Sequence, residues 1–147
     1  MPSTLSMLDP NTLKEALLGA GFEVYRATAS EIQIAERVRL HIMDSGVRVL
    51  ASEPLMIRFT ARSQRSDSPH LDRDALFARV RDEVGGGASE RGYREAEAAT
   101  VEVKDPMDEA KILDVWHEIT YERSLETLEG LIEELHWAIH VEKYVSA

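Results

Sequence analysis

The residues with the clearest metal-like spacing lie near the C-terminal end of the chain. Two carboxylates and two histidines recur there at helical intervals: Glu129, Glu133, His136 and His140. On an α-helix they would form one stripe, because residues three or four positions apart are neighbours. Two histidines one turn apart can share a zinc ion with a carboxylate as a third ligand. Since Trp137 follows His136, the HExxH sequence is absent, and we expect a solvated flank with no metal, a zinc site being the alternative.

His117 is the second chemical candidate, as a proton donor or acceptor. On the expected strand, alternation places it on the side that faces the core, between Val115 and Ile119. A buried histidine can transfer protons when a carboxylate orients it, and Glu36 and Glu53 have inward parity on other strands. These residues could form the pocket of a small enzyme. We favour a histidine at the core edge with a backbone partner, or a bulge that turns the side chain outward, and we assign no catalytic residue and no cofactor.

Arginine and methionine side chains could bind another protein. On the side of the expected strands that faces away from the core, cationic and apolar residues occur together: Arg37, Arg39, His41, Met43, Arg48, Leu50, Met56, Arg58 and Arg62. Met and Arg suit protein-binding surfaces. We therefore predict four partner-binding residues, which are Arg39, Met56, Arg58 and Arg62. The alternative is an ordinary solvated sheet face, in which the arginine stems cover apolar neighbours.

The last expected helix has two apolar sides. Its main stripe is formed by Leu125, Leu128, Ile132, Leu135 and Ile139, and Trp137, Val141 and Tyr144 lie on another side. A helix with a second apolar patch usually meets a second surface. We predict a homodimer through Trp137, Val141 and Tyr144, with packing within the chain or a foreign partner as alternatives.

The elements that must position these residues are organised around residues 31–62. Apolar residues of one parity precede Asp44, and apolar residues of the other parity follow Gly46, as alternation on strands requires. A two-residue turn at Ser45-Gly46 would put both sets on one face, whereas a three-residue turn would separate them. Gly46 would supply the positive φ of such a turn. We predict two long strands in which Ile42 and Val49 are cross-strand neighbours on the buried face.

Signals for helices and strands flank this hairpin. Asp9 is a good N-cap with Pro10 at the first helical position, and the helix should end near Gly19. A first strand should begin at residue 22. A second helix should follow Asp72 and end at 85–87, a Gly-Gly-Gly run that we interpret as a linker because no Gly-Lys-Ser/Thr follows it.

Two more strands, near 93–104 and 113–121, and a long helix capped by Ser124 complete the expected order α-β-β-β-α-β-β-α. The sequence thus predicts an α+β fold with an antiparallel sheet of about five strands flanked by helices. We expect a loose tail over 1–8 and a single domain over 9–147.

Composition narrows the possible functions. The chain has 147 residues, no cysteine and a net charge of −10. Residues 1–69 carry 8 basic and 8 acidic side chains, and residues 70–147 carry 9 basic and 19 acidic ones. The acidic excess argues against nucleic-acid binding, which depends on phosphate neutralisation, and is compatible with solubility or with a basic partner that approaches the second half. The sequence has neither a membrane-length apolar run nor a signal-peptide pattern, so we expect no membrane association and a cytoplasmic location.

The order of elements, including the long final helix Leu125 to Tyr144, resembles that of class I type III secretion chaperones and of YbjN-like bacterial proteins. The resemblance implies a non-catalytic α+β domain that dimerises and binds an extended segment of another protein. We therefore expect a chaperone- or adaptor-like binding module. The alternatives are a small enzyme that uses His117 and a metal-binding protein that uses the last helix.

Overall fold

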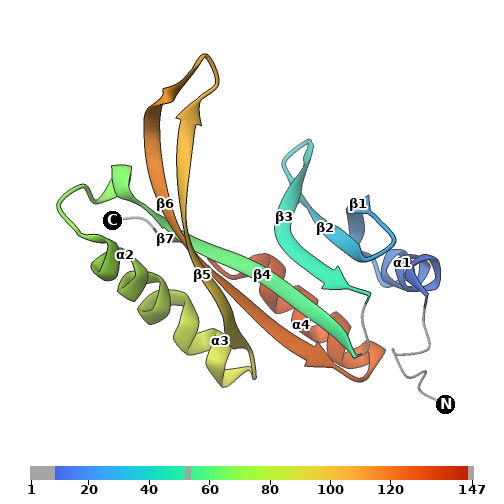
Figure 1. Ribbon diagram of the computed structural model, residues 1–147. Helices are drawn as coiled ribbons and strands as arrows, with labels where there is room; N and C mark the ends of the chain where they lie inside the picture. Colours follow the sequence, from blue (N-terminus) through green and yellow to red (C-terminus); the bar gives the residue numbers. More distant parts are fainter. Residues whose placement is uncertain (1–8, 52–53, 146–147) are drawn as a thin grey trace. The chain divides into compact units, whose positions relative to one another are not determined.

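The computed structural model describes residues 9–51 and 54–145 (Figure 1). Helix α1 (Pro10–Gly19) begins as predicted, because the Asp9 side chain accepts a hydrogen bond from the backbone N–H of Thr12 at 2.7 Å. Leu13 and Leu17 on its inner side are fully buried. The tail predicted for residues 1–8 lies outside the described residues, as does Glu53.

Four strands follow α1: β1 (Glu23–Ala27), β2 (Glu31–Val38), β3 (His41–Leu50) and β4 (Leu55–Gln64). Three of them lie where we predicted two, and the turn between β2 and β3 is at Arg39-Leu40, since Val38 pairs with His41. The predicted register is therefore wrong. Ile42 and Val49 are both on β3, with Ile42 half-exposed opposite Arg37 and Val49 buried opposite Ile32.

A β-bulge in β3 explains the error. Between two paired positions β2 advances from Gln33 to Ala35 while β3 runs from Arg48 to Asp44, so β3 carries additional residues. Ser45 Oγ donates to the Ile34 carbonyl oxygen at 2.6 Å and accepts from the Val47 N–H at 3.2 Å. Gly46 has the predicted positive φ, 81°, and its N–H donates to Asp44 Oδ1 at 2.9 Å. Positive φ at Gly46 thus serves a bulge and not a turn.

After a short 3-10 turn, η2 (Arg65–Asp67), the chain is helical from 73 to 90. Helix α2 (Arg73–Val80), capped by Asp72, continues into the π-helical turn η3 (Arg81–Gly85) and then into α3 (Gly86–Glu90). The interpretation of 85–87 as a linker is therefore wrong. A Cβ on Gly85 would lie 2.7 Å from the Tyr121 hydroxyl oxygen, so close packing explains this glycine.

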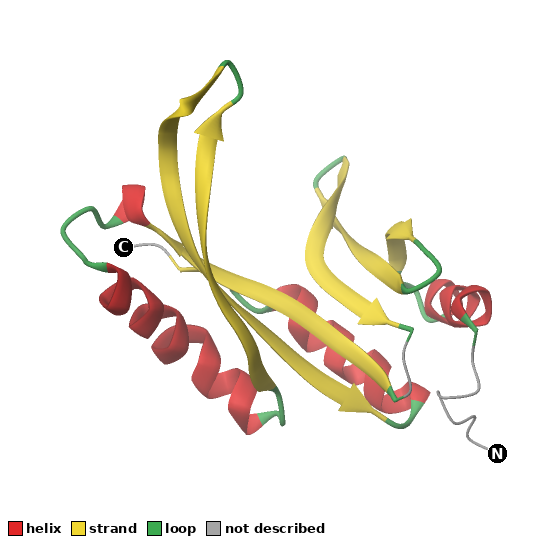
Figure 2. Cartoon of the chain, in the orientation of Figure 1, coloured by secondary structure: helices red, strands yellow, loops and turns green. Residues whose placement is uncertain are grey.

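The chain ends in a long hairpin, a helix and a short strand, coloured by type in Figure 2: β5 (Arg94–Asp105), β6 (Asp108–Leu125), α4 (Leu128–His140) and β7 (Tyr144–Val145). Helix α4 is shorter than predicted at both ends. Its cap is Thr127, whose Oγ1 accepts from the Gly130 N–H at 3.1 Å, and Val141 is already extended.

The mixed α+β class agrees with the prediction, although the described residues contain seven strands and not five. The sheet order is β1-β2-β3-β4-β6-β5, and β7 pairs in parallel with β4. By compactness the chain divides into two units: Met1–Phe59 with Glu122–Val141, and Thr60–Tyr121 with Glu142–Ala147. Strands β4 and β6 therefore contribute residues to both units.

Each unit has its own apolar core. The first unit buries residues of α1, β2, β3, the first half of β4 and α4, including Leu17, Ile34, Val49, Phe59 and Leu135. The second unit buries residues of α2, η3 and β6, including Leu76, Phe77, Val80, Val84 and Ile119. Within the described ranges, no helix has the length and apolar character needed to cross a membrane.

Candidate functional site

One side of strand β4 carries all of the predicted partner-binding residues except Arg39. Its side chains alternate between a buried set, Leu55, Ile57, Phe59, Ala61 and Ser63, and a half-buried set, Met56, Arg58, Thr60, Arg62 and Gln64. Side chains of the half-buried set contact side chains of the neighbouring strand β6. This alternation agrees with the predicted outward parity of Met56, Arg58 and Arg62.

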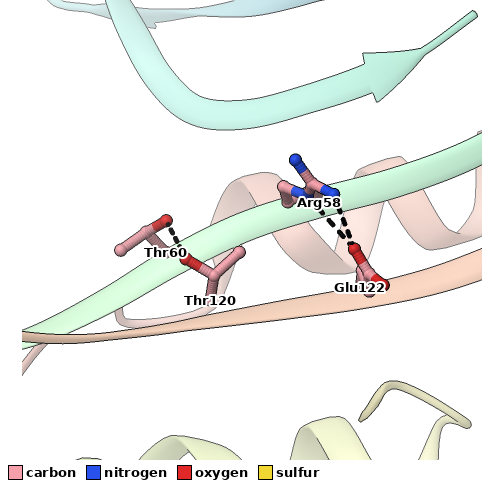
Figure 3. A network of polar contacts seen from close by, with 4 residues as sticks. All are labelled: Arg58, Thr60, Thr120 and Glu122. Carbon is pink, nitrogen blue, oxygen red and sulfur yellow. Dashed lines mark hydrogen bonds and ion pairs between the residues drawn. The ribbon is translucent and has the colours of Figure 1, made fainter. Parts of the chain in front are cut away.

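In the first unit, Arg58 is engaged by a carboxylate of the same chain. Its Nη2 and Nε donate to Glu122 Oε2 at 2.8 and 3.2 Å (Figure 3). The Glu122 side chain is only 6% exposed, so the guanidinium neutralises a buried charge that would be costly alone. Arg58 therefore has a structural partner that the sequence did not reveal.

In the second unit, polar contacts continue along the same side of β4 and β6. The Thr60 and Thr120 hydroxyls are 3.0 Å apart (Figure 3). The Arg62 guanidinium lies 3.8 Å from the centre of the Trp116 ring, which is cation–π geometry. These contacts occupy much of the surface on which we expected Arg62 to bind a partner.

Asp114, on β6, is hydrogen-bonded to Ser66 of η2. Burial raises the pKa of its carboxyl, but hydrogen bonds from the Ser66 hydroxyl and from the Val115 and Ser66 N–H groups outweigh burial and lower the pKa. Ser66 Oγ is 2.6 Å from Asp114 Oδ2. A carboxylate held ionised by several donors is typical of a structural anchor.

Arg39 is placed apart from the other three predicted partner-binding residues. It lies in the β2–β3 turn with φ 56°, a left-handed conformation that is uncommon for residues other than glycine. The predicted turn was in the wrong place, so Arg39 lies at a turn and not within a strand as we expected, and its part in binding a partner stays a prediction.

His117 is buried as predicted, in the second unit. Its Nδ1 is 3.1 Å from Thr100 Oγ1, and its ring meets Phe77 edge-on at 5.0 Å between centroids. Burial lowers its pKa, and the charges of Arg73 and Arg65 lower it further. Among the described residues its hydrogen-bond partner is a hydroxyl and not a carboxylate, and the lowered pKa favours the uncharged ring.

Glu36, proposed as a companion of His117, belongs to the other unit, on β2. The other proposed companion, Glu53, is outside the described residues. The small-enzyme alternative that would use His117 with Glu36 or Glu53 therefore stays a prediction.

The two histidines of α4 border a cleft in the first unit. The cleft, of about 360 Å³, is also lined by Phe22, Glu23 and Glu36. The His136 ring packs against Phe22 in a tilted arrangement, with 4.8 Å between ring centroids, and His140 Nδ1 lies 2.7 Å from the His136 carbonyl oxygen. Over 9–51 and 54–145, no group of three or more His, Cys, Asp or Glu is arranged to hold a metal ion.

The predicted dimerisation residues do not share one helical face. Trp137 is half-buried on α4 and packs edge-on against Phe59 at 5.7 Å. Val141 follows the helix in an extended conformation, and Tyr144 lies in β7, where its hydroxyl donates to Gln64 Oε1 at 3.0 Å. Packing within the chain thus accounts for part of this apolar surface, and dimerisation through Trp137 stays a prediction.

The feature that sequence reasoning missed is the edge formed by β5. Among the described residues β5 has one strand neighbour, β6, and it stands at the end of the sheet. It is 12 residues long, and most of its residues are exposed. Its Ala-rich, charged sequence suggested a weak strand, and only the topology shows that it is an edge.

Comparisons with known proteins give no assignment: no family model, curated protein or solved structure matches this chain. The resemblance to secretion chaperones and YbjN-like proteins therefore stays a prediction.

Proposed function

We propose that this chain is a non-catalytic, chaperone- or adaptor-like binding module that takes up an extended segment of a partner protein as an added strand beside β5. The observation that carries the proposal is the position of β5 at the end of the sheet, with most of its 12 residues exposed and none buried. A terminal strand presents a row of backbone N–H and C=O groups, and extended peptides bind such rows by main-chain hydrogen bonds.

Several properties favour β5 over the other terminal strand, β1. Strand β1 has only 5 residues and an irregular register between Val24 and Arg26. Strand β5 contains no proline, and Ala96, Ala98 and Ala99 provide a stretch of small side chains beside its backbone. An incoming strand could therefore approach β5 closely over several residues.

The charge of β5 indicates the chemistry of the partner. Glu97 and Glu102 are exposed on this strand, while Glu95 is paired with Arg81 at 2.8 Å. Residues 70–147, which include β5, carry the whole net charge of −10. Since opposite charges favour cross-strand pairs, the captured segment should alternate Lys or Arg with β-branched residues. Arg58 and Arg62 have partners of their own, whereas Arg39 and Met56 stay candidates for further contacts.

The proposal can be tested with proline at neighbouring positions of β5. In an antiparallel strand, successive N–H groups point alternately towards and away from the neighbouring strand. Of Ala98→Pro and Ala99→Pro, one therefore removes a bond to β6, and the other removes an outward donor while leaving the fold intact. We expect the folded variant to lose binding of an alternating Lys-Val peptide, measured by fluorescence anisotropy.

Two controls make the result specific. An alternating Glu-Val peptide should bind more weakly than the Lys-Val peptide, and Ala98→Thr should fold and bind like the wild type. If the wild type binds neither peptide, or if the correctly folded proline variant binds as well as the wild type, strand addition at β5 is refuted.

A further inference from the structure

The exposed apolar residues of this protein gather at two places. All of the large ones among the described residues, except Leu18 and Tyr25, lie on the turn-proximal parts of two hairpins. In Figure 1 the β2–β3 turn projects away from α1, and the β5–β6 turn projects away from α2 and α3. Clustered apolar side chains in water mark interaction surfaces more often than scattered ones do.

The first cluster, here called the basic tip, comprises residues 37–43. Its exposed apolar members are Val38, Leu40, Ile42 and Met43, and Leu40 is 92% exposed. It carries two arginines and no acidic residue, although Glu36 and Asp44 flank it and Arg37 pairs with Glu23 at 2.6 Å. Arg39 at the turn is thus the principal cation of this tip.

The backbone of Arg39 is a second sign of function at the basic tip. Arg39 is the one residue other than glycine with positive φ in the described ranges. Glycine or asparagine would fit this conformation at lower cost, and strained backbone persists mainly where function or the surroundings require it.

The second cluster, here called the acidic tip, comprises residues 101–113. Its exposed apolar members are Val101, Met107, Ile112 and Leu113, and Met107 is 93% exposed. It carries four acidic residues, Glu102, Asp105, Asp108 and Glu109, against two lysines, Lys104 and Lys111. Asp105 and Asp108 also accept backbone N–H groups of their own turn, whereas Glu109 is free to meet a partner.

We propose that the basic tip of one copy of this protein docks on the acidic tip of a second copy. The two tips match in being two-stranded ribbons with apolar ends, and they are opposite in charge. Such a contact joins different surfaces of identical chains and is therefore heterologous. It is distinct from the strand addition proposed for β5 and from the predicted contact through Trp137.

Opposite charges at the tips are needed because the copies repel each other as a whole. Each chain carries a net charge of −10, and salt weakens this repulsion and the local attraction together. Complementary charges of this kind chiefly determine which surfaces meet and in which orientation. Reversing one charge at each tip, alone and together, therefore tests the proposed contact more sharply than a change of salt concentration does.

The test uses Arg39→Glu, Glu109→Arg and the double variant, each studied by sedimentation velocity over a range of concentrations. We expect the wild type to self-associate and each single variant to stay monomeric, because each substitution removes the net charge of one tip: Arg39→Glu takes residues 37–43 from +2 to 0, and Glu109→Arg takes residues 101–113 from −2 to 0. The double variant restores opposite charges at positions 39 and 109 and should associate again. An equimolar mixture of the two single variants should also associate.

Matched variants separate charge from fold and from the apolar contribution. Arg26→Glu reverses an exposed arginine on β1 in the same unit as the basic tip and should associate like the wild type. Leu40→Ser keeps every charge and should weaken association, since it removes the most exposed apolar side chain of that tip. Far-UV circular dichroism should be the same for all of these variants.

Three results would overturn the proposal. One is a wild type that is monomeric at high micromolar concentration. The same holds if that monomer binds phosphatidylserine vesicles and loses this binding in Arg39→Glu, because the basic tip would then bind a membrane and not a second copy. Another is an oligomer that survives Arg39→Glu and is lost on Trp137→Glu, which would place the interface on α4. The third is a double variant that fails to associate although it is folded.

Discussion

At the scale of single residues, one hydroxyl group holds the bulge of β3 together. Ser45 is 7% exposed, and its Oγ both donates to the Ile34 carbonyl oxygen and accepts from the Val47 N–H. No water is needed to satisfy these two backbone groups. The side chain thus replaces the ladder bonds that the additional residues of β3 interrupt.

Ser45→Ala should therefore lower the free energy of unfolding by about 1–3 kcal/mol, because it leaves a buried carbonyl oxygen and a buried N–H without this partner. Urea unfolding followed by circular dichroism measures the loss. Ser124→Ala is the control, since Ser124 is exposed and Thr127, not Ser124, caps α4. Equal stability of the two variants would show that the hydroxyl is dispensable.

His117 should make stability depend on pH. Burial, then Arg73 and Arg65, lower its pKa in the folded state below the ordinary value of 6.5. Below that value the unfolded chain binds a proton that the folded chain does not, so folding loses stability as the pH falls. The contribution of His117 to stability is complete above about pH 6.5, and it is lost as the pH falls towards the lower pKa of the folded state.

We expect His117→Gln to reduce the fall in the free energy of unfolding between about pH 7 and pH 5. The slope, and not the absolute stability, is the quantity to compare, because glutamine packs differently from histidine against Phe77. Parallel slopes for the wild type and the variant would contradict the assignment, and titration of the His117 ring by NMR would locate its pKa directly.

At the scale of elements, the helical stretch from 73 to 90 depends on one close contact. Gly85 and Gly86 both have helical backbone angles, with φ −61° in each case. An added Cβ at Gly85 would meet the Tyr121 hydroxyl at 2.7 Å, whereas at Gly86 it would meet nothing within 4 Å. Alanine substitutions at these two neighbouring glycines should therefore have opposite effects on stability.

Gly86→Ala should stabilise the protein by about 0.5–1 kcal/mol, since alanine loses less backbone entropy than glycine in a helix. Gly85→Ala should destabilise it by about 1–3 kcal/mol through overpacking. Thermal unfolding distinguishes the two variants. Adding Tyr121→Phe to Gly85→Ala should recover part of the loss, because the nearest remaining ring atom is 3.5 Å away, and purely additive effects would rule the contact out.

Local signals in the sequence predicted the elements better than their connections. The cap at Asp9 and the strands over 23–27 and 94–105 agree with the structure. The turn was misplaced because Gly46 satisfies positive φ equally in a turn and in a bulge. Alternation alone could not show that Val38, Leu40 and Ile42 pass beyond the core.

The candidate site could be predicted only in part, for a related reason. Parity correctly placed Met56, Arg58 and Arg62 away from the buried side of β4. Their neighbours, Glu122 and Trp116, come from β6, far along the chain. A sequence pattern reports periodicity within a strand but not the identity of the strand beside it, so neither these contacts nor the edge at β5 was visible.

At the scale of the whole molecule, the two compact units share their strands. The first half of β4 and the end of β6 belong to one unit, and the rest of both strands belongs to the other. Each unit contains one tryptophan, Trp137 in the first and Trp116 in the second. The chain thus carries a natural fluorescent reporter for each unit.

Unfolding should be a single cooperative transition, because neither unit can lose β4 and β6 while the other keeps them. In Trp116→Phe the fluorescence reports the first unit, and in Trp137→Phe it reports the second. Within each variant we expect the fluorescence and far-UV circular dichroism transitions to coincide in urea. Separate midpoints would show that the units unfold independently.

The same interleaving of the units has a consequence for the order in which the chain is synthesised. Residues of β3 and β4 that end up buried, such as Val49 and Phe59, leave the ribosome long before α4, the helix that supplies Leu131 and Leu135 to the same core. Contacts between distant parts of a chain form slowly, and uncovered apolar strands can aggregate meanwhile. The core of the first unit is therefore begun early but completed only after α4 has been made, and a pause in translation before residue 128 would prolong the exposure of its apolar side.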